Sequence, residues 1–372
     1  MQGTWRTQAS EHRHVAVVGG GVVGCAVAFE LARRGMAVTL IERDAVAAHA
    51  SGFNAGNINP LHFTPPALIP QALAAFAIHR EVRAALAALD CAQFVALPVR
   101  RLHLGFTAAD RPHLQETASL FAANPGFGAT WLERDELLAC EPRLAADVAF
   151  GVLSEGNLSV DSGDFTRSLA AGAVRLGART VTATARGVVA RGDLVTGVAT
   201  DQGVIGCDAV VFATGPWVAE VNGWLGIEVA VEPVKGELLL MRLPDGAPRF
   251  DLTWGFASLY RRRNDEVWVG GTFERSLFDA TPTAAAKASM LERAARILPA
   301  IRQAELLDHV ASLRPMAAPN APVAMRAAGW ANAYVANGGG SKGVLFAVFI
   351  AKCIGDLVLE RPDVQTAAAA II

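Results

Sequence analysis

The sequence predicts an α/β protein in which buried parallel strands and helices are interrupted by strand-rich segments. Three short apolar runs, at residues 14–18, 209–213 and 334–336, are typical of parallel strands covered on both faces, and each leads into a glycine turn. Between the second and third runs, residues 229–273 alternate apolar stretches with turn residues, which is typical of antiparallel strands. Because the three runs lie near both ends and in the middle of the 372-residue chain, a simple string of two domains is not expected.

The first run opens a strand–turn–helix–strand unit with glycines where close approach is needed. Gly19 permits the tight turn out of the strand, Gly21 lets the backbone approach a pyrophosphate, and Gly24 lets helix and strand pack closely. The helix expected over residues 22–34 directs free N–H groups at the phosphates. Glu42 ends the second strand, where a carboxylate accepts hydrogen bonds from ribose hydroxyls and repels a 2′-phosphate. The unit therefore predicts a dinucleotide site.

The remaining elements follow from periodicity and from the positions of glycine and proline. Residues 51–57 form a loop of small side chains that can lie flat against a ligand, and residues 338–343 form a second glycine turn. Helices are expected over residues 65–90, 108–123, 133–140, 164–176, 283–298 and 343–359. Strands are expected over residues 99–106, 150–153, 194–200, 234–242, 254–261, 267–272 and 306–315, and near 180–190.

Charge and hydropathy exclude several classes of protein. Lysine and arginine number 33 against 35 acidic residues, a balance that gives no general attraction to nucleic acid or to an anionic membrane. The apolar stretch at residues 343–359 is interrupted by Lys352 and Asp356, which come too early for a transmembrane helix. Residues 1–13 are polar and show no secretory signal, so we expect a cytoplasmic protein.

The cysteines and histidines show no spacing that binds a metal. The five cysteines are scattered without a Cys-x-x-Cys pair, and the eight histidines show neither His-x-x-x-His nor His-Glu-x-x-His spacing. We therefore expect reduced thiols, no disulfide framework and no metal site.

A set of motifs, kept in one order along the chain, carries a family resemblance. After the first glycine turn come Ser51-Gly52-Phe53-Asn54-Ala55-Gly56, Ala213-Thr214-Gly215-Pro216-Trp217, Pro233-Val234-Lys235-Gly236-Glu237, Ser312-Leu313-Arg314-Pro315 and the turn at 338–343. The later motifs resemble the ATGAW, PVRGQ and GLRP elements and the C-terminal flavin-binding turn of the FAD-dependent D-amino-acid oxidase and glycine oxidase superfamily. That superfamily also includes sarcosine oxidases and D-amino-acid dehydrogenases. The resemblance covers residues 14–360.

This resemblance implies a glutathione-reductase-type, FAD-binding Rossmann domain and a substrate domain whose mixed antiparallel sheet roofs the flavin. The FAD-binding domain is expected to be discontinuous, formed by residues 14–90, 150–225 and 310–360. The substrate-binding domain is expected over residues 91–149 and 226–309. The segment 213–215 and the turn at 338–343 would add contacts that NAD does not need, whereas FAD must be held along its whole length. The resemblance therefore favours FAD.

The resemblance also implies the residues that contact FAD. They are Val18, Gly19, Gly21, Val22, Val23, Gly24, Glu42, Arg43, Ser51, Gly52, Asn54, Ala55, Gly56, Ala185, Ala213, Thr214, Gly215, Trp217, Gly338, Gly339, Gly340, Ser341, Lys342 and Gly343. Non-covalent FAD is expected, because the attachment cysteine of sarcosine oxidases has no counterpart around Arg314 and Asn54 stands where flavin-linked dehydrogenases carry histidine.

Three residues are candidates for catalysis and substrate binding. In the family, the flavin N5 takes a hydride from the carbon that bears an amine, and water hydrolyses the resulting imine. Arg314 matches an arginine that binds the substrate carboxylate, or is a structural arginine paired with an acid. Tyr260 lies near the position of a substrate-contacting tyrosine, with Ser258 or a merely packed tyrosine as alternatives. Lys342 either supplies positive charge at the flavin or faces solvent.

The departures from the family pattern leave the substrate open. The histidine of the glycine-oxidase turn is replaced by glycine, and its substrate-facing arginine falls on Ser341, which disfavours glycine itself. The oxygen-activating lysine of monomeric sarcosine oxidase falls near Trp268, so O2 and a quinone or other carrier both remain candidate electron acceptors. Oxidation of a 2-hydroxy acid or glycerol phosphate is an alternative, as is a flavin subunit of a hetero-oligomeric amine or opine oxidase. Homo-oligomers also remain open.

Overall fold

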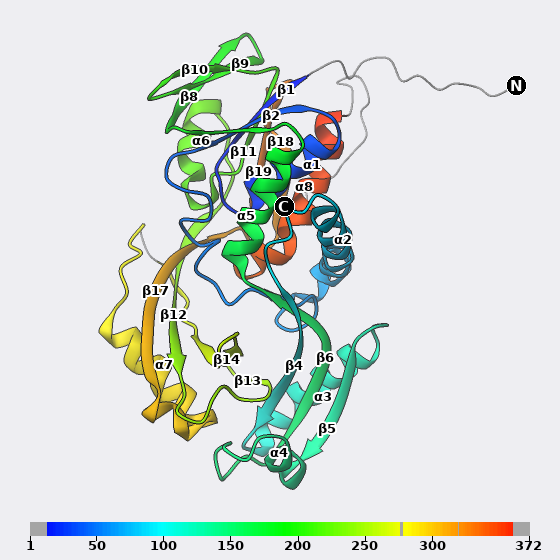
Figure 1. Cartoon of the computed structure of the whole chain (residues 1–372), viewed down its shortest axis with the longest axis vertical. Helices are drawn as coiled ribbons and strands as arrows, with labels where there is room; N and C mark the ends of the chain where they lie inside the picture. Colours follow the sequence, from blue (N-terminus) through cyan, green and yellow to red (C-terminus); the bar gives the residue numbers. More distant parts are fainter. Residues whose placement is uncertain (1–12, 276–277, 319, 360–372) are drawn as a thin grey trace, which may run out of the picture.

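The computed structural model describes residues 13–275, 278–318 and 320–359. Figure 1 shows a smaller sheet with its helices in the upper half of the molecule and a larger sheet in the lower half. Two predictions fall outside the described residues: the absence of a secretory signal over residues 1–12, and the end of the last FAD-binding segment at residue 360.

The smaller sheet contains the strand–turn–helix–strand unit predicted for a dinucleotide site, with its two strands side by side. Its six strands lie in the order β18-β19-β11-β1-β2-β7, and all neighbours are parallel except β18 and β19. The strands are β1 (His14–Val18), β2 (Ala37–Glu42), β7 (Arg179–Thr182), β11 (Ala209–Phe212), β18 (Pro322–Arg326) and β19 (Ala333–Gly338). The apolar run 14–18 is thus central, with β11 on one side and β2 on the other.

Both faces of this sheet are covered at its centre, which explains why the central strands β1 and β11 are almost entirely apolar. Val15 and Val17 of β1 pack into a core with helices α1 (Val22–Arg33), α2 (Ile69–Ala88), α5 (Ser162–Arg175) and α8 (Gly343–Leu359). Ala16 and Val18 face the other side. There they join a core with α6 (Val218–Leu225) and the three-stranded sheet of β8 (Ala185–Arg191), β9 (Leu194–Thr200) and β10 (Gly203–Gly206).

The larger sheet is antiparallel except where β13 pairs with β4. Its order is β16-β12-β15-β14-β13-β4-β6-β3, with β17 paired to β12 and β5 paired to β6. The strands are β3 (Asn57–Ile58), β4 (Ala96–Gly105), β5 (Gly128–Glu133), β6 (Phe150–Val160), β12 (Glu232–Arg242), β13 (Asp251–Trp254), β14 (Ala257–Arg261), β15 (Glu266–Gly270), β16 (Glu274–Arg275) and β17 (Glu305–Met316). Helices α3 (Arg111–Ala122), α4 (Arg134–Cys140) and α7 (Ala284–Ile297) contribute to the apolar clusters beside it.

Several elements differ from the sequence prediction for identifiable reasons. The single strand expected over 254–261 is the hairpin of β13 and β14, which turns at Gly255 with a φ of 53°. The segment near 180–190 is likewise two strands, β7 and β8. Strand β6 continues to Val160. The sequence prediction ended it near 153 because buried polar residues in its later half break the apolar pattern. Helix α6 and strands β5 and β18 were not predicted.

The predicted division into two domains stays a proposal. The structure places β6, which the division assigned to the FAD-binding part, in the larger sheet beside β4. The boundary between residues 309 and 310 passes through the continuous strand β17. The two parts therefore share strands, and a boundary drawn by sequence number does not coincide with the sheets.

The described residues also bear on the membrane and metal predictions. None of the helices within the described ranges is long and apolar enough to cross a membrane. Over the same residues, no three His, Cys, Asp or Glu side chains come together as a set that could hold a metal ion. All five cysteines are free, and burial raises the pKa of the Cys25 and Cys207 thiols.

Candidate active site

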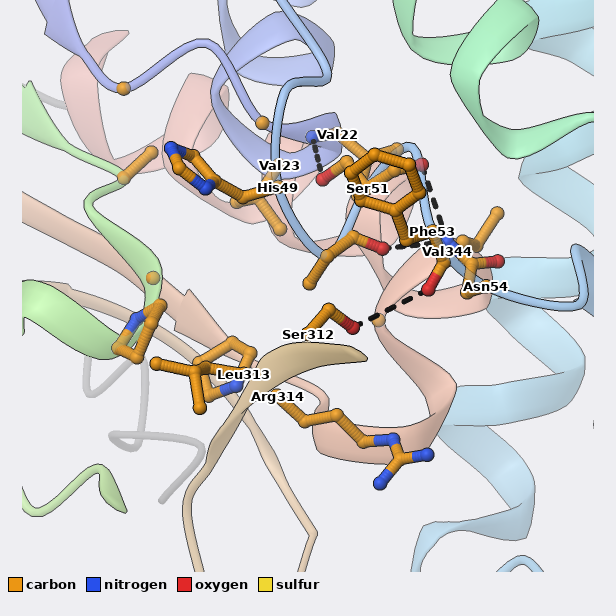
Figure 2. Close-up of a pocket in the computed structure, with 18 of the residues that line it drawn as sticks. Val22, Val23, His49, Ser51, Phe53, Asn54, Ser312, Leu313, Arg314 and Val344 are labelled. Atoms are coloured by element: carbon orange, nitrogen blue, oxygen red, sulfur yellow. Dashed lines mark hydrogen bonds between the residues drawn. The ribbon is translucent and has the colours of Figure 1, made fainter. Parts of the chain in front are cut away.

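A cavity of about 360 Å³ lies where the two sheets meet. Its wall includes the end of β1, the end of β2 and the turn before α8 from the smaller sheet. Strands β4, β12, β14 and β17 of the larger sheet, together with the loop that follows β3, close it from the other side. We call these two parts the turn end and the roof end. In Figure 2, His49 and Arg314 lie at opposite sides of this pocket.

Most of the residues predicted to contact FAD line this one cavity. The exceptions are Gly24, Gly52 and Gly339, which do not reach the wall. A Cβ atom on Gly24 would lie 1.9 Å from the carbonyl oxygen of Gly19, and one on Gly52 would lie 2.3 Å from the carbonyl oxygen of Ala47. Gly24 and Gly52 therefore shape the wall from behind, because any side chain there would meet fixed backbone.

The first glycine turn is held open by backbone geometry. Gly19 has a φ of 113°, and a Cβ atom there would lie 2.3 Å from the carbonyl oxygen of Ala213. The Ser51 hydroxyl accepts a hydrogen bond of 2.8 Å from the N–H of Val22 in the first turn of α1 (Figure 2). The hydroxyl oxygen of Thr214, on the opposite segment, is buried and has no partner among the described residues. The site therefore presents an unsatisfied polar group beside a cradle that only glycine allows.

Glu42 lies where the sequence predicted, at the carboxyl end of β2. Its carboxylate accepts hydrogen bonds from the N–H of Gly20 and, at 2.9 Å, from the N–H of Asp44. Next to it, the Arg43 guanidinium lies 4.0 Å from the centre of the Trp217 ring, a cation–π contact. An acid and a flat cationic–aromatic surface thus bound the turn end.

The second glycine turn is equally constrained. Gly338, Gly339 and Gly340 have φ values of 75°, 78° and 41°, which favour glycine. A Cβ atom on Gly340 would lie 2.0 Å from the side-chain oxygen of Asn320. The turn leads directly into α8, whose first N–H groups it leaves next to the cavity.

Lys342 is buried at this turn, so the solvent-facing alternative is wrong. Its Nζ donates hydrogen bonds to the carbonyl oxygens of Asn59, at 2.8 Å, and His62. Burial, and then the positive charge of Arg101, lower the pKa of Lys342 to about 7. The Lys342 side chain therefore connects the loop that follows β3 to the turn. Because its pKa is close to neutral pH, small changes in the charges around it decide whether the amine is protonated.

Arg314 projects from β17 at the roof end (Figure 2). Its Nη1 donates a 3.0 Å hydrogen bond to the carbonyl oxygen of Thr272. A Cβ atom on Gly236 would lie 2.0 Å from Nη2, so the guanidinium rests on that glycine. Among the described residues no acid forms an ion pair with Arg314, which favours a role in substrate binding over a structural arginine paired with an acid. Burial lowers the pKa of Arg314, and Tyr260 opposes that shift.

Tyr260 on β14 lines the cavity, whereas Ser258 does not. Ser258 is buried and shares a 3.0 Å hydrogen bond with the hydroxyl of Thr253. Trp268 pairs with Tyr260 across the strands and stays off the cavity wall. Of the two roof positions that sequence reasoning weighed, the structure therefore brings only Tyr260 to the site.

Sequence reasoning missed two further roof-end residues, Arg101 and His62, which line the same cavity. Arg101 follows Arg100 in β4, and adjacent side chains on a strand face opposite sides. Arg100 is paired with Glu155 at the surface, and Arg101 is buried. Two consecutive arginines inside a predicted strand were the signal that one of them faces inward.

Comparison with known proteins decides the family. A family model described as DAO, FAD dependent oxidoreductase, matches residues 14–357. The chain belongs to this family. FAD is therefore its cofactor, and the unpartnered Thr214 hydroxyl and the glycine cradle fit such a dinucleotide.

The relatives narrow the description of this FAD-dependent oxidoreductase. It is 31% identical over 375 residues to a glycine oxidase of Pseudomonas aeruginosa, covering 94% of the chain and 96% of the relative. The solved glycine oxidase of Geobacillus kaustophilus has a TM-score of 0.87 at 25% identity, covering 97% and 99% of the two chains. FAD-bound L-alpha-glycerophosphate oxidase of Mycoplasma pneumoniae shares the fold, with a TM-score of 0.82 at 20% identity over 94% and 96%. The chain is a glycine-oxidase-like oxidoreductase of the amino-acid and amine oxidase family.

Proposed function

We propose that this enzyme oxidises the C–N bond of a small amino acid or secondary amine that carries a carboxylate. The observation that carries the proposal is Arg314, a guanidinium on the cavity wall that has no acidic partner among the described residues. Arg314 is half-buried, and an anion offsets the desolvation of a guanidinium at such a position. A substrate carboxylate supplies that anion in the planar, two-bonded geometry that arginine favours.

The residues around Arg314 orient it for this task. The Thr272 carbonyl oxygen takes one N–H of the guanidinium, and Gly236 supports its flat face, so few rotamers remain open. Tyr260 adds a phenol on the neighbouring strand. Held in this way, the substrate presents its amine-bearing carbon to FAD, which supplies the chemistry by accepting a hydride from that carbon.

We further propose that the turn end holds FAD without a covalent bond. The first glycine turn and the start of α1 would bind the pyrophosphate, and Glu42 the adenosine ribose. Lys342 and the start of α8 would offer positive potential to the flavin. Non-covalent binding is supported by the cavity wall, to which the described chain contributes no cysteine, and by Asn54, whose amide donates to the carbonyl oxygens of Ala50 and Ser51.

The test is anaerobic visible spectroscopy of the purified holoenzyme with separate panels of amino acids, N-methyl and N-carboxymethyl amines, and hydroxy acids. Bleaching of the flavin by one class of carboxylate-bearing amine supports the proposal. Bleaching by hydroxy acids alone, or by no compound, overturns it. Acid precipitation of the same sample tests the bond to FAD, because non-covalent flavin stays in the supernatant.

The same experiment also tests the electron acceptor and the need for a partner subunit. Air admitted after bleaching reoxidises the flavin at once if O2 is the acceptor, and a quinone analogue does so if another carrier is used. A holoenzyme that turns over amines by itself needs no partner subunit. We retain a cytoplasmic location as part of the proposal.

A further inference from the structure

Arg101 is a second guanidinium at the roof end with unused hydrogen-bonding capacity. Arg101 lies on β4, is 3% exposed and lines the cavity. Nη2 donates to the carboxylate of Asp251 at 2.9 Å and to the side-chain oxygen of Asn57 at 3.1 Å. Nε is buried and has no partner among the described residues. A buried, charged donor left in this way is destabilising. Because Arg101 lines the cavity, an anion bound there can supply acceptors to its guanidinium.

His62 adds a second unsatisfied group beside Arg101. Its Nε2 is buried and has no partner among the described residues, although the ring lines the cavity. The ring is packed between Phe63, with centroids 3.9 Å apart, and His103, at 4.5 Å. Burial and the nearby charges of His103, Arg101 and Lys342 lower the pKa of His62 well below its usual value, so the imidazole is neutral. A neutral ring that is fixed by packing is suited to hydrogen-bond a ligand.

Tyr260 lies near both Arg101 and Arg314. The Arg101 guanidinium lies 5.4 Å from the centre of the Tyr260 ring, and Tyr260 also influences the pKa of Arg314. Two arginines from different strands therefore lie near the same tyrosine, and all three residues line the cavity.

The charge at the roof end is not balanced by the cavity wall. Within the described part of the chain, the acidic residues that line the cavity are Glu42, at the end of β2, and Glu220, on α6. The buried carboxylate of Asp251 forms an ion pair with one nitrogen of Arg101, Nη2. Lys342 adds positive charge when protonated. A substrate with one carboxylate satisfies Arg314 and leaves Arg101 with an open donor.

We propose that Arg101 and His62 form a second anion-binding site, and that the substrate is an amine bearing two carboxylates. One carboxylate binds Arg314, the other binds Arg101 and His62, and the amine-bearing carbon lies between them near Tyr260. This inference rests on the proposed function and specifies its substrate class. The reaction is unchanged: a hydride passes from the carbon to FAD, nitrogen loses a proton, and water hydrolyses the imine to a carbonyl acid and an amine.

Calorimetric titration of the holoenzyme tests the second site without turnover. Succinate and its mono-amide succinamate are unreactive probes that differ in one charge. We expect succinate to bind at least about tenfold more tightly, because a charged hydrogen-bonded pair is much stronger than a neutral one. Equal affinities, or no binding of either probe, would overturn the proposal and leave Arg101 as a structural ion-pair partner of Asp251.

Variants assign the preference to named residues. Arg101→Met combined with Asp251→Asn removes both charges of the buried pair, which avoids leaving Asp251 unpaired. We expect the succinate preference to disappear in this double variant and to weaken in His62→Phe. Arg100→Met, on the exposed side of the same strand, is the matched control and should keep the wild-type ratio. A preference that survives in the double variant contradicts the assignment.

A substrate comparison separates this inference from the function on which it rests. The probes are aspartate against asparagine, in both enantiomers, and N-carboxymethylglycine against its mono-amide. Equal kcat/KM for acid and amide would overturn the second site and leave amine oxidation standing. Flavin that no amine bleaches, together with a tenfold preference for succinate, would overturn the proposed function and leave the anion site standing.

Discussion

The two ends of the cavity are built from different parts of the polypeptide. At the turn end, the wall is mostly backbone: Gly19, Gly338 and Gly340 adopt φ values that favour glycine, and helices begin beside them. At the roof end, the wall is a set of charged and polar side chains, Arg314, Tyr260 and Arg101, each from a different strand. Recognition by the backbone requires glycines at fixed spacing, and that spacing is visible in a sequence. Recognition by side chains depends on which strands become neighbours, and a sequence does not show which strands pair.

The sharpest test of the turn end is Gly24→Ala. The new methyl group would lie 1.9 Å from the carbonyl oxygen of Gly19, so the helix must move away from the strand. We expect loss of nearly all bound flavin, measured as the ratio of visible to ultraviolet absorbance of the purified protein.

Gly223→Ala is the matched control for that change. Gly223 lies inside α6, and nothing lies within 4 Å of the position its Cβ would take. Full flavin content in Gly24→Ala would show that the close approach at the turn is not needed.

Arg314→Leu tests the roof end with the next largest effect. Loss of the guanidinium should reduce kcat/KM by roughly 10²- to 10³-fold, mainly through KM, because a buried charge pair with the substrate is lost. Flavin content should stay at the wild-type level. Arg302→Leu, an exposed position, serves as the control. An unchanged KM for the preferred substrate would remove Arg314 from substrate binding.

His79 supports the turn end from behind and should make it sensitive to acid. The ring lies 3.0 Å from the carbonyl oxygen of Val344 and 3.1 Å from that of Leu345, at the start of α8. Burial lowers the pKa of His79 from 6.5 to about 4. Between pH 6.5 and about pH 4 the His79 ring is protonated in the unfolded chain but stays neutral in the folded protein. Acid therefore favours the unfolded state, and stability that is present above pH 6.5 is lost as the pH falls toward 4.

We therefore expect about 2 kcal/mol of the loss in unfolding free energy between pH 7.5 and pH 5 to come from His79. Urea unfolding at the two pH values measures it, and His79→Leu should lose that much less stability on acidification. His113→Leu, at an exposed histidine, should follow the wild type. Equal acid sensitivity of His79→Leu and the wild type would contradict the assignment.

The smallest expected change in activity comes from substitutions on β14, at Tyr260 and Ser258. Tyr260→Phe removes only a hydroxyl at the cavity and should lower kcat/KM roughly fivefold. Ser258→Ala should leave kcat/KM within error while it lowers thermal stability, because its hydroxyl bonds to Thr253 within the sheet. The reverse pattern would place Ser258, rather than Tyr260, at the substrate.

The sequence was informative where geometry is local. The first glycine turn, Glu42 and the turn before α8 were predicted with their neighbours in register, because each depends on residues a few positions apart. Strand β6 was predicted too short, since Ser154, Asn157 and Ser159 are buried polar residues inside it. Arg101 was missed because nothing local shows which of two adjacent arginines faces the cavity.

The central position of β1 has a consequence for how the protein is made. Its neighbours β2 and β11 are separated from each other by more than 160 residues of chain, and β19 and α8, which complete the same wall, follow later still. A nascent chain on the ribosome therefore lacks part of the nucleotide cradle until residues up to about 343 have emerged. Cofactor capture is therefore expected only after that point. Until then the chain has many long-range contacts still to form, so it folds slowly and exposes apolar surface that is prone to aggregate.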